Sequence, residues 1–244
     1  MHVMKSFPSA LVGALALFAI FAGAATAADI QLGVTKTPMV APVCPPGVAQ
    51  NQCNIVVPQM TVYNTTSDGV SNPMMIHKPG EIVSVKVGIS TISTSPKILR
   101  TDISYLNKTY GGPAEAELAV LKRVGKRTKL RWAVVAESPA YQLQPYRSQV
   151  VQFPLATPLP VVPGEMVALT VPTWAPILSY DLTASKFAYR QSRMTNCTKA
   201  GASTVIQAQL TIGQQARYGC NYQGTRVQYS AEEITTPVPT AVNK

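Results

Sequence analysis

The sequence is short of acidic residues and of histidine. Its 244 residues include only 11 Asp and Glu, against 21 Lys and Arg, and only two His. So few carboxylates provide little material for an acid-lined catalytic cleft. After residue 28 the only histidine is His77, and the chain has no Gly-x-Ser-x-Gly motif, so a Ser-His-Asp hydrolase is not indicated. We therefore predict a protein that is not an enzyme and that needs no cofactor.

Long apolar runs are also missing after the first 28 residues, where none approaches the roughly 20 residues of a transmembrane helix. The first 28 residues combine Lys5, an uncharged apolar run over residues 10–25 and the small residues Ala25-Thr26-Ala27. This pattern is typical of a secretory signal peptide, although an uncleaved anchor is the alternative. We expect a secreted protein at the cell surface or outside the cell.

Cysteine is scarce and is not arranged for metal binding. The four residues, Cys44, Cys53, Cys197 and Cys220, lack the closely spaced pairs of zinc sites, so no metal centre is predicted. An even number of cysteines in an exported chain predicts two disulfides. Three pairings are possible, and the short, turn-rich segment 44–53 favours Cys44 with Cys53 and Cys197 with Cys220.

Alternating apolar and polar residues dominate the rest of the chain. Two Pro-Gly-Glu turns, at 79–81 and 163–165, each lead into such a segment, and Val83, Val85 and Val87 fall on one side of the first. No convincing helical period is found. Strands are predicted at residues 60–63, 81–90, 98–106, 117–124, 129–136, 149–153, 165–171, 187–193, 203–212 and 226–230. We expect an all-β fold, an antiparallel β-sandwich of jelly-roll type with about ten strands, with an up-and-down barrel as the alternative.

These strands set the predicted domain organisation. Residues 1–28 form the signal peptide, and residues 29–58 form an extended, Pro-rich segment stapled by its own disulfide. Residues 59–231 form the β-sandwich domain. Residues 232–244 form a polar, flexible C-terminal tail.

Three motifs carry a resemblance to known proteins. Residues 111–121 read GGPAEAELAVL, residues 132–138 read WAVVAES, and residues 159–169 read LPVVPGEMVAL. This succession resembles secreted bacterial jelly-roll proteins of unknown function, over roughly residues 76–231. The resemblance implies the fold and brings no catalytic residue with it.

Two carboxylates could still suggest glycoside hydrolysis. Glu115 and Glu117 are two residues apart on a predicted strand, which places their backbones about 6.7 Å apart. That distance is near the carboxylate separation of inverting glycosidases. Neighbours on one strand face each other poorly across a substrate, however, so a solvated strand entrance is the favoured interpretation.

A basic segment provides a better binding candidate. Residues 122–131 carry six Lys and Arg around Gly125, a pattern typical of a hairpin tip. Lys126, Arg127 and Lys129 would extend into solvent and hold phosphate or sulfate groups. A hairpin that only adds solubility and protects a sheet edge is the favoured interpretation of this segment by itself.

Aromatic residues provide a second candidate. Trp174 lies between Pro172 and Pro176, in a stiff loop that could present its ring to a sugar. Three tyrosines in other loops could join it: Tyr141, Tyr146 and Tyr180. Packing against the end of the sandwich is nevertheless the favoured interpretation of Trp174, and Trp132 is predicted to lie in the core.

Together these features predict a secreted, non-enzymatic β-sandwich that binds a glycan or an anionic wall polymer at the cell surface. The net charge of +10 favours anionic partners in general but indicates no specific nucleic acid. A structural or protein-interaction domain of the cell envelope, binding through a sheet edge or an apolar rim, is the alternative. A glycoside hydrolase is the third hypothesis.

Overall fold

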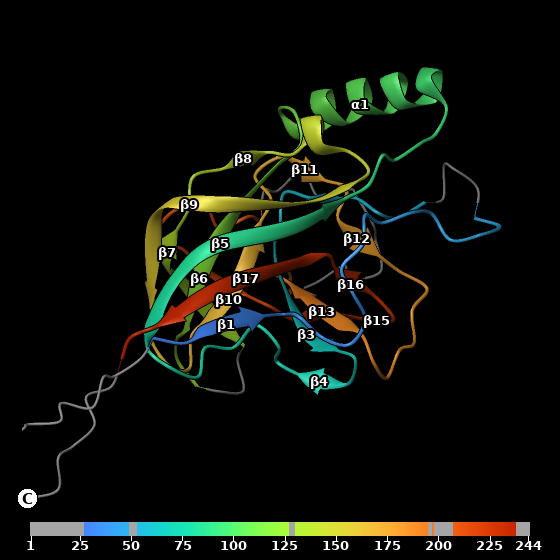
Figure 1. Cartoon of the computed structure of the whole chain (residues 1–244). Coiled ribbons are helices and arrows are strands. Elements are labelled where there is room, and N and C mark those ends of the chain that lie inside the picture. Colours follow the sequence, from blue (N-terminus) through green and yellow to red (C-terminus); the bar gives the residue numbers. More distant parts are fainter. Residues whose placement is uncertain (1–26, 49–52, 127–129, 195–196, 198–206, 238–244) are drawn as a thin grey trace, which may run out of the picture.

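The computed structural model describes residues 27–48, 53–126, 130–194, 197 and 207–237. In this part of the chain, antiparallel strands form two principal sheets that pack face to face (Figure 1). The predicted all-β antiparallel sandwich is confirmed. The period of two in the sequence sets this fold, because each strand buries one face against the opposite sheet.

The smaller sheet has four strands in the order β1-β17-β5-β9. The central strands β17 and β5 are long and pair over most of their length. Their bounds are β1 Asp29–Leu32, β17 Tyr229–Thr235, β5 Gly80–Ile89 and β9 Gln149–Val161.

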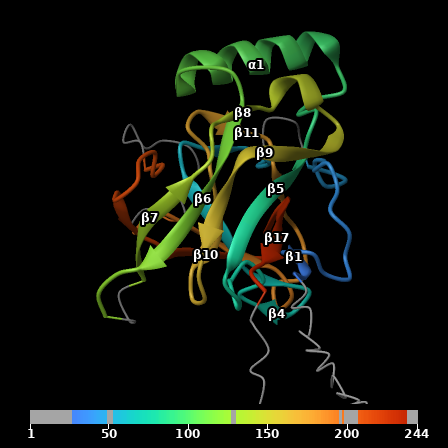
Figure 2. The same cartoon turned by 60° about the vertical axis from the view of Figure 1, so that its left-hand side comes forward.

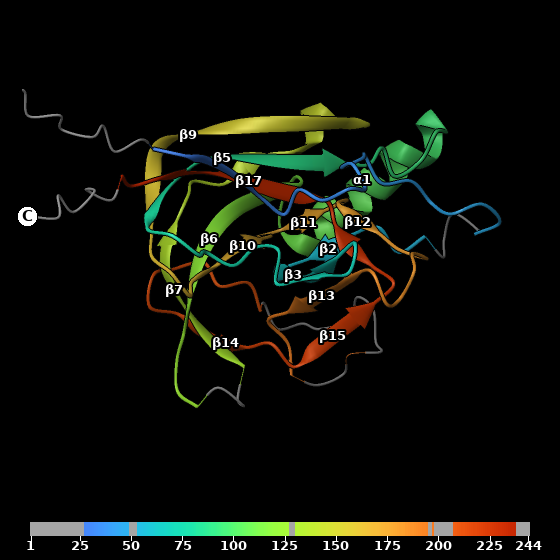
Figure 3. The ribbon, with the colours of Figure 1, turned by 60° about the horizontal axis from the view of Figure 1, so that its bottom comes forward.

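The larger sheet has nine strands, seven of them in the order β14-β7-β6-β10-β3-β13-β15. The bounds are β14 Gln215–Arg217, β7 Arg131–Glu137, β6 Glu115–Arg123, β10 Met166–Thr170, β3 Thr61–Ser67, β13 Ala188–Gln191 and β15 Cys220–Gln223. Two short strands pair at its margins, β4 (Val70–Ser71) with β3 and β8 (Tyr141–Gln142) with β6. Strands β14 and β15 stand at opposite ends of this order, yet only Tyr218 and Gly219 separate them, so the sheet curls (Figure 3).

Two small sheets of two strands each accompany the principal sheets. β2 (Val57–Pro58) pairs with β11 (Trp174–Ala175), and β12 (Leu178–Ser179) pairs with β16 (Arg226–Val227).

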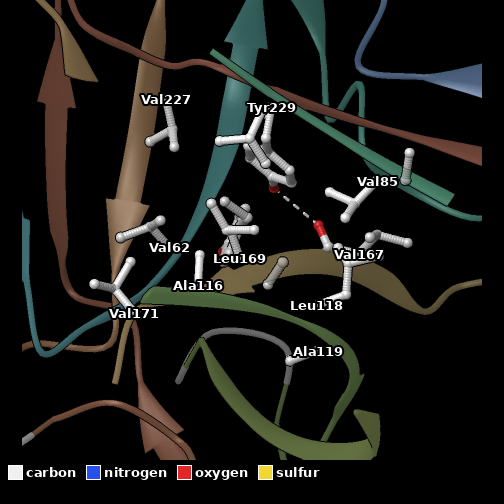
Figure 4. Packing of buried hydrophobic residues seen from close by; sticks show 14 of the residues in the cluster. Val62, Val85, Ala116, Leu118, Ala119, Val167, Leu169, Val171, Val227 and Tyr229 are labelled. Atoms are coloured by element: carbon white, nitrogen blue, oxygen red, sulfur yellow. Dashed lines mark hydrogen bonds between the residues drawn. The ribbon is translucent and has the colours of Figure 1, made fainter. Parts of the chain in front are cut away.

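The core fills the space between the two principal sheets (Figure 4). Leu118, Val167 and Leu169 from the larger sheet meet Val85 and Tyr229 from the smaller one, and all five are buried. Trp132 is 1% exposed, which confirms its predicted place in a buried position.

The first Pro-Gly-Glu strand differs from its predicted pattern at one point. A β-bulge between Ile82 and Ser84 shifts the register of β5 against β9. Ile82 is therefore fully buried and Val83 only partly so, while Val85 and Val87 keep their predicted place in the core. The extra residue of a bulge reverses the side-chain alternation beyond it.

The strand predicted at residues 98–106 is wrong, because this segment forms helix α1 (Pro96–Tyr110). The Ser95 side chain accepts a hydrogen bond from the Ile98 amide, Pro96 begins the helix, and Gly111 ends it at a φ of 84°. These are ordinary helix caps, and they outweigh the short alternation around them. The helix lies across one end of the sandwich (Figure 2). Its half-buried apolar residues follow a helical spacing: Leu99, Ile103, Leu106 and Tyr110.

The chain ends also differ from the predicted domain organisation. Residues 232–235 are part of β17 and pair with both β5 and β1, so the C-terminal tail does not begin at residue 232. Residues 29–32, predicted to belong to a separate lead-in, form β1 of the smaller sheet. Of the predicted strand at 203–212, residues 203–206 lie outside the described residues, and Gln207 forms only an isolated bridge with Met60.

Both predicted disulfides are confirmed. Cys44 bonds with Cys53, and Cys197 bonds with Cys220. In the residues that the structure describes, no helix has the length and apolar character needed to cross a membrane.

A buried amide joins β3 to the strand that leads into β17. The Asn64 side chain donates to the Val227 carbonyl at 2.9 Å and accepts from the Val227 amide at 3.0 Å. Asn64 is fully buried, so neither backbone group of Val227 has water as a substitute partner.

Replacing Asn64 by Ala should lower the free energy of unfolding by about 2–4 kcal/mol, because two buried backbone groups lose their partners. Urea unfolding followed by circular dichroism measures this change. The exposed Asn221→Ala is the matched control and should change stability by less than about 0.5 kcal/mol. An equal effect of the two substitutions would contradict the role given to Asn64.

Candidate functional site

Trp174 does not offer a surface for a sugar. Its side chain is 1% exposed, and its indole Nε1 donates to Asn107 Oδ1 at 3.0 Å and to the Gly112 carbonyl at 3.1 Å. Asn107 belongs to α1, and Gly112 lies in the turn that follows this helix. The hypothesis of a sugar-binding ring at Trp174 is therefore wrong, because stacking on a sugar needs an open ring face, and the packing favoured for this residue is what the structure has.

The three tyrosines predicted to accompany Trp174 do not gather around it. Tyr141 and Tyr146 instead pack on Phe153, with ring centroids 4.9 and 5.4 Å away. Tyr146 is 38% exposed. Tyr180 makes no ring contact with them among the described residues, and its buried hydroxyl has no hydrogen-bond partner there. The predicted common platform of four rings is therefore not formed.

Three carboxylates gather on the β6–β7 pair. Glu115 and Glu117 lie on β6, and Glu137 pairs opposite Ala119 at the end of β7. Burial, followed by the charges of Glu137 and Glu115, raises the pKa of Glu117 to about 8. Burial also raises the pKa of Glu137. None of the three lines the pockets of about 510 Å³ and 420 Å³.

Positive charge is segregated along the chain. Residues 118–136 and 182–231 contain no Asp or Glu, yet they hold 12 of the 21 Lys and Arg. The two stretches meet in the larger sheet, where β7 from the first pairs with β14 from the second. Figure 3 shows β7, β14, β13 and β15 along one side of the molecule. This side therefore collects Lys and Arg from two segments that contain no acidic residue, and Glu137 at the end of β7 lies just outside the first of them.

A polar pocket of about 510 Å³ opens on this side. Arginines, amide side chains and a hydroxyl provide most of its lining, and no acidic residue takes part. The lining residues are Arg131, Ser192, Met194, Gln207, Gln214, Gln215, Ala216 and Arg217. Its volume is in the range of ordinary ligand pockets.

Two arginines stand directly opposite each other beside this pocket. Arg131 of β7 and Arg217 of β14 are register partners in an antiparallel pair. In the described part of the chain neither guanidinium has an acidic partner. Like charges placed directly across a strand pair destabilise the sheet, and an anion bound between them would remove that repulsion. The arrangement is suited to binding phosphate, sulfate or carboxylate groups.

The predicted basic hairpin borders the same region. Lys126 is exposed next to Gly125, whose φ of 73° makes the turn between β6 and β7. Arg127 and Lys129 lie outside the described residues. Arg123 packs over the Trp132 ring at 4.5 Å from its centroid, so this cation also supports the packing of β7.

Sequence reasoning missed Arg217. It stands alone in its segment, and no local motif marks it. The signal that could have indicated it is the absence of acidic residues between Asp181 and Glu232. This absence extends over about 50 residues and does not single out Arg217. Only the pairing of β14 with β7 places Arg217 opposite Arg131.

Comparisons with known proteins add no function. No protein-family model, no curated protein and no solved structure matches this chain.

The raised pKa of Glu117 predicts a pH-dependent stability. The unfolded carboxyl releases its proton near its ordinary pKa of 4.5, whereas the folded one keeps it to about 8. Folding stability is therefore lost as the pH rises through this window. Glu117→Gln removes the titration and should raise the free energy of unfolding at pH 8 by on the order of 1–3 kcal/mol, with little effect near pH 4.

Thermal unfolding of Glu117→Gln and wild type across pH 4–8 measures this difference. Glu81→Gln, which removes an exposed carboxylate on β5, is the matched control. Parallel pH profiles for Glu117→Gln and wild type would contradict the prediction.

Proposed function

We propose that this protein is a secreted β-sandwich that binds an anionic polymer and acts by binding rather than by catalysis. The observation that supports this proposal is the pairing of Arg131 with Arg217 beside the 510 Å³ pocket, where two segments without acidic residues, 118–136 and 182–231, meet. The two disulfides fit an oxidising compartment, which is where a surface polymer would be met.

The proposed ligand is a polymer with repeated phosphate, sulfate or carboxylate groups, such as an acidic glycan or a wall polymer. Single anions would contact Arg131 and Arg217, while neighbouring groups of the polymer would reach the cations of the hairpin around Lys126. The amide-rich lining suits hydrogen bonds to hydroxyl and acidic oxygens. Because Trp174 is buried, recognition would rest on charge and hydrogen bonds and not on ring stacking.

The alternative function, a protein-interaction domain of the envelope, is favoured by a different observation. In the part of the chain that the structure describes, the smaller sheet ends at β1, which has an unpaired edge beside a mainly apolar pocket. The two functions use different surfaces, so one protein can perform both.

Replacing Arg131 and Arg217 together by Ser should weaken binding to heparin and to polyphosphate about tenfold, with elution at lower salt. Retention on heparin and polyphosphate columns measures this effect, and a neutral dextran column reports non-ionic binding. The matched control is the pair Lys97→Ser and Arg100→Ser on α1, which removes the same charge from exposed positions elsewhere. An equal loss of retention in the two double variants would show that only net charge matters, and it would contradict a specific site at Arg131 and Arg217.

A further inference from the structure

The two edges of the smaller sheet differ in their protection. β9 carries Pro154, Pro158 and Pro160, each two or four residues from the next. Proline has no amide hydrogen, so these residues remove donors from one side of an edge strand. β1 has the sequence DIQL and contains no proline. Of these two edges, β1 is therefore the one that can accept a further strand.

The backbone of β1 shows which of its groups point outward. Thr235 donates to the Ala28 carbonyl at 2.9 Å, on the side of β17, whereas Gly33 donates to the Pro73 carbonyl at 2.9 Å, on the opposite side. Backbone N–H and C=O groups alternate in direction along an antiparallel strand. The backbone groups of Asp29 and Gln31 therefore point to the same side as those of Gly33. Among the described residues they have no backbone partner on that side. The Gly33 amide, directly after β1, already donates a hydrogen bond to a carbonyl outside the sheet.

A pocket of about 420 Å³ runs along this edge. It lies between β1 with the residues after it and the segment around β4, which is itself paired only with β3. Figure 1 shows β1 and β4 on the same lower side of the molecule. The pocket lining is mainly apolar, and two of its valines, Val34 and Val70, are 55% and 54% exposed. An open strand edge next to exposed apolar side chains is the arrangement used in strand addition.

Buried polar contacts hold the wall of this pocket in place. The Arg226 guanidinium, 1% exposed, donates to the Thr37 carbonyl at 2.8 Å and to the Gly33 carbonyl at 3.4 Å. Asp68 accepts from the Thr37 amide at 2.7 Å and from the Thr37 hydroxyl at 2.5 Å. Partial burial alone would raise the pKa of Asp68, but the interactions with Thr35 and Thr37 and the charge of Arg226 lower it to about 2. The segment that follows β1 is therefore fixed before any partner binds, which reduces the entropy cost of binding.

The charges around the pocket select the kind of partner. Asp68 lines the pocket, but Arg226 and Thr37 compensate its charge. The nearby Glu233 is buried, and the positive potential of His77 and Lys78 acts on it. Lys36 is exposed, lines the pocket and has no acidic partner among the described residues. An acidic side chain on the partner would complement it.

We propose that the β1 edge binds an extended segment of another polypeptide, with apolar residues at alternate positions and an acidic residue near Lys36. The segment would add a strand to β1 through the outward groups of Asp29 and Gln31. Its alternate side chains would contact Val34 and Val70, and an acidic residue would face Lys36. This site is independent of the anion-binding pocket.

Synthetic peptides of about eight residues test the proposal, with Val at alternate positions and Glu, Lys or Ser between them. Fluorescence polarisation with the disulfide-bonded protein should show the strongest binding for the Glu series, and Lys36→Glu should reverse the preference between Glu and Lys. Methylating alternate backbone nitrogens of the peptide should weaken binding about tenfold, because hydrogen bonds to β1 are lost. Equal binding of methylated peptides, or no binding by any series up to about 1 mM, would overturn the proposal.

Two pairs of variants locate the site on the protein. Gln31→Pro removes an outward donor and should weaken binding about tenfold, whereas Gln31→Ala keeps the backbone and should not. Val70→Lys should weaken binding, while Val150→Lys, at a comparably exposed valine of β9, should have no effect. Unchanged thermal unfolding of Gln31→Pro and Val70→Lys shows that the variants fold.

The same variants separate the other possible occupants. Dimerisation in sedimentation equilibrium that Val70→Lys abolishes would assign the edge to a second copy of this chain and overturn the peptide proposal. Heparin retention of Val70→Lys should equal that of wild type, because the anion-binding pocket uses other residues.

Discussion

The hydrogen bonds made by residues 226–229 are the constraint on which much of this structure depends. In this short segment the chain passes between the two sheets, where its polar groups have no access to water. The Asn64 carboxamide binds both backbone groups of Val227, and the Tyr229 hydroxyl donates to the Val167 carbonyl at 3.0 Å (Figure 4). Arg226 turns to the other side and holds the residues after β1. Because buried polar groups are costly unless they are paired, these contacts fix one crossing geometry.

Both proposed binding surfaces follow from places where this sandwich is not closed. The larger sheet curls until β14 and β15 are separated by only two residues, and the anion-binding pocket lies beside that junction. The smaller sheet stops at β1, whose outer backbone groups face a second pocket. Strands need partners on both sides, so the margins of sheets are where unsatisfied groups and unpaired charges collect. Both proposed binding surfaces therefore lie at sheet margins and not in the apolar core.

Much of the fold follows from local pattern, and the failures have physical causes. The alternation around Val85 and Val87 predicts their burial correctly, and the short segment between Cys44 and Cys53 favours the pairing that is found. The segment 98–106 shows the limit, since Leu99 and Ile103 fit a strand or a helix and the caps Ser95 and Gly111 decide between them. The error at Trp174 follows from that one, because the residue that binds its indole, Asn107, lies on the missed helix. Exposure of a ring depends on what packs over it, and that is not a local property.

By itself, the sequence determined the strand periodicity and the segregation of acidic from basic residues, and its cysteine spacing favoured the pairing that is found. Each of these features depends on residues that are close together in the chain, so it can be predicted without knowing the tertiary structure. Only the tertiary structure decided that Arg131 stands opposite Arg217, that α1 covers Trp174 and that, among the described strands, β1 has an open edge. These features depend on which strand lies next to which, and strand order is set by burial of the whole core.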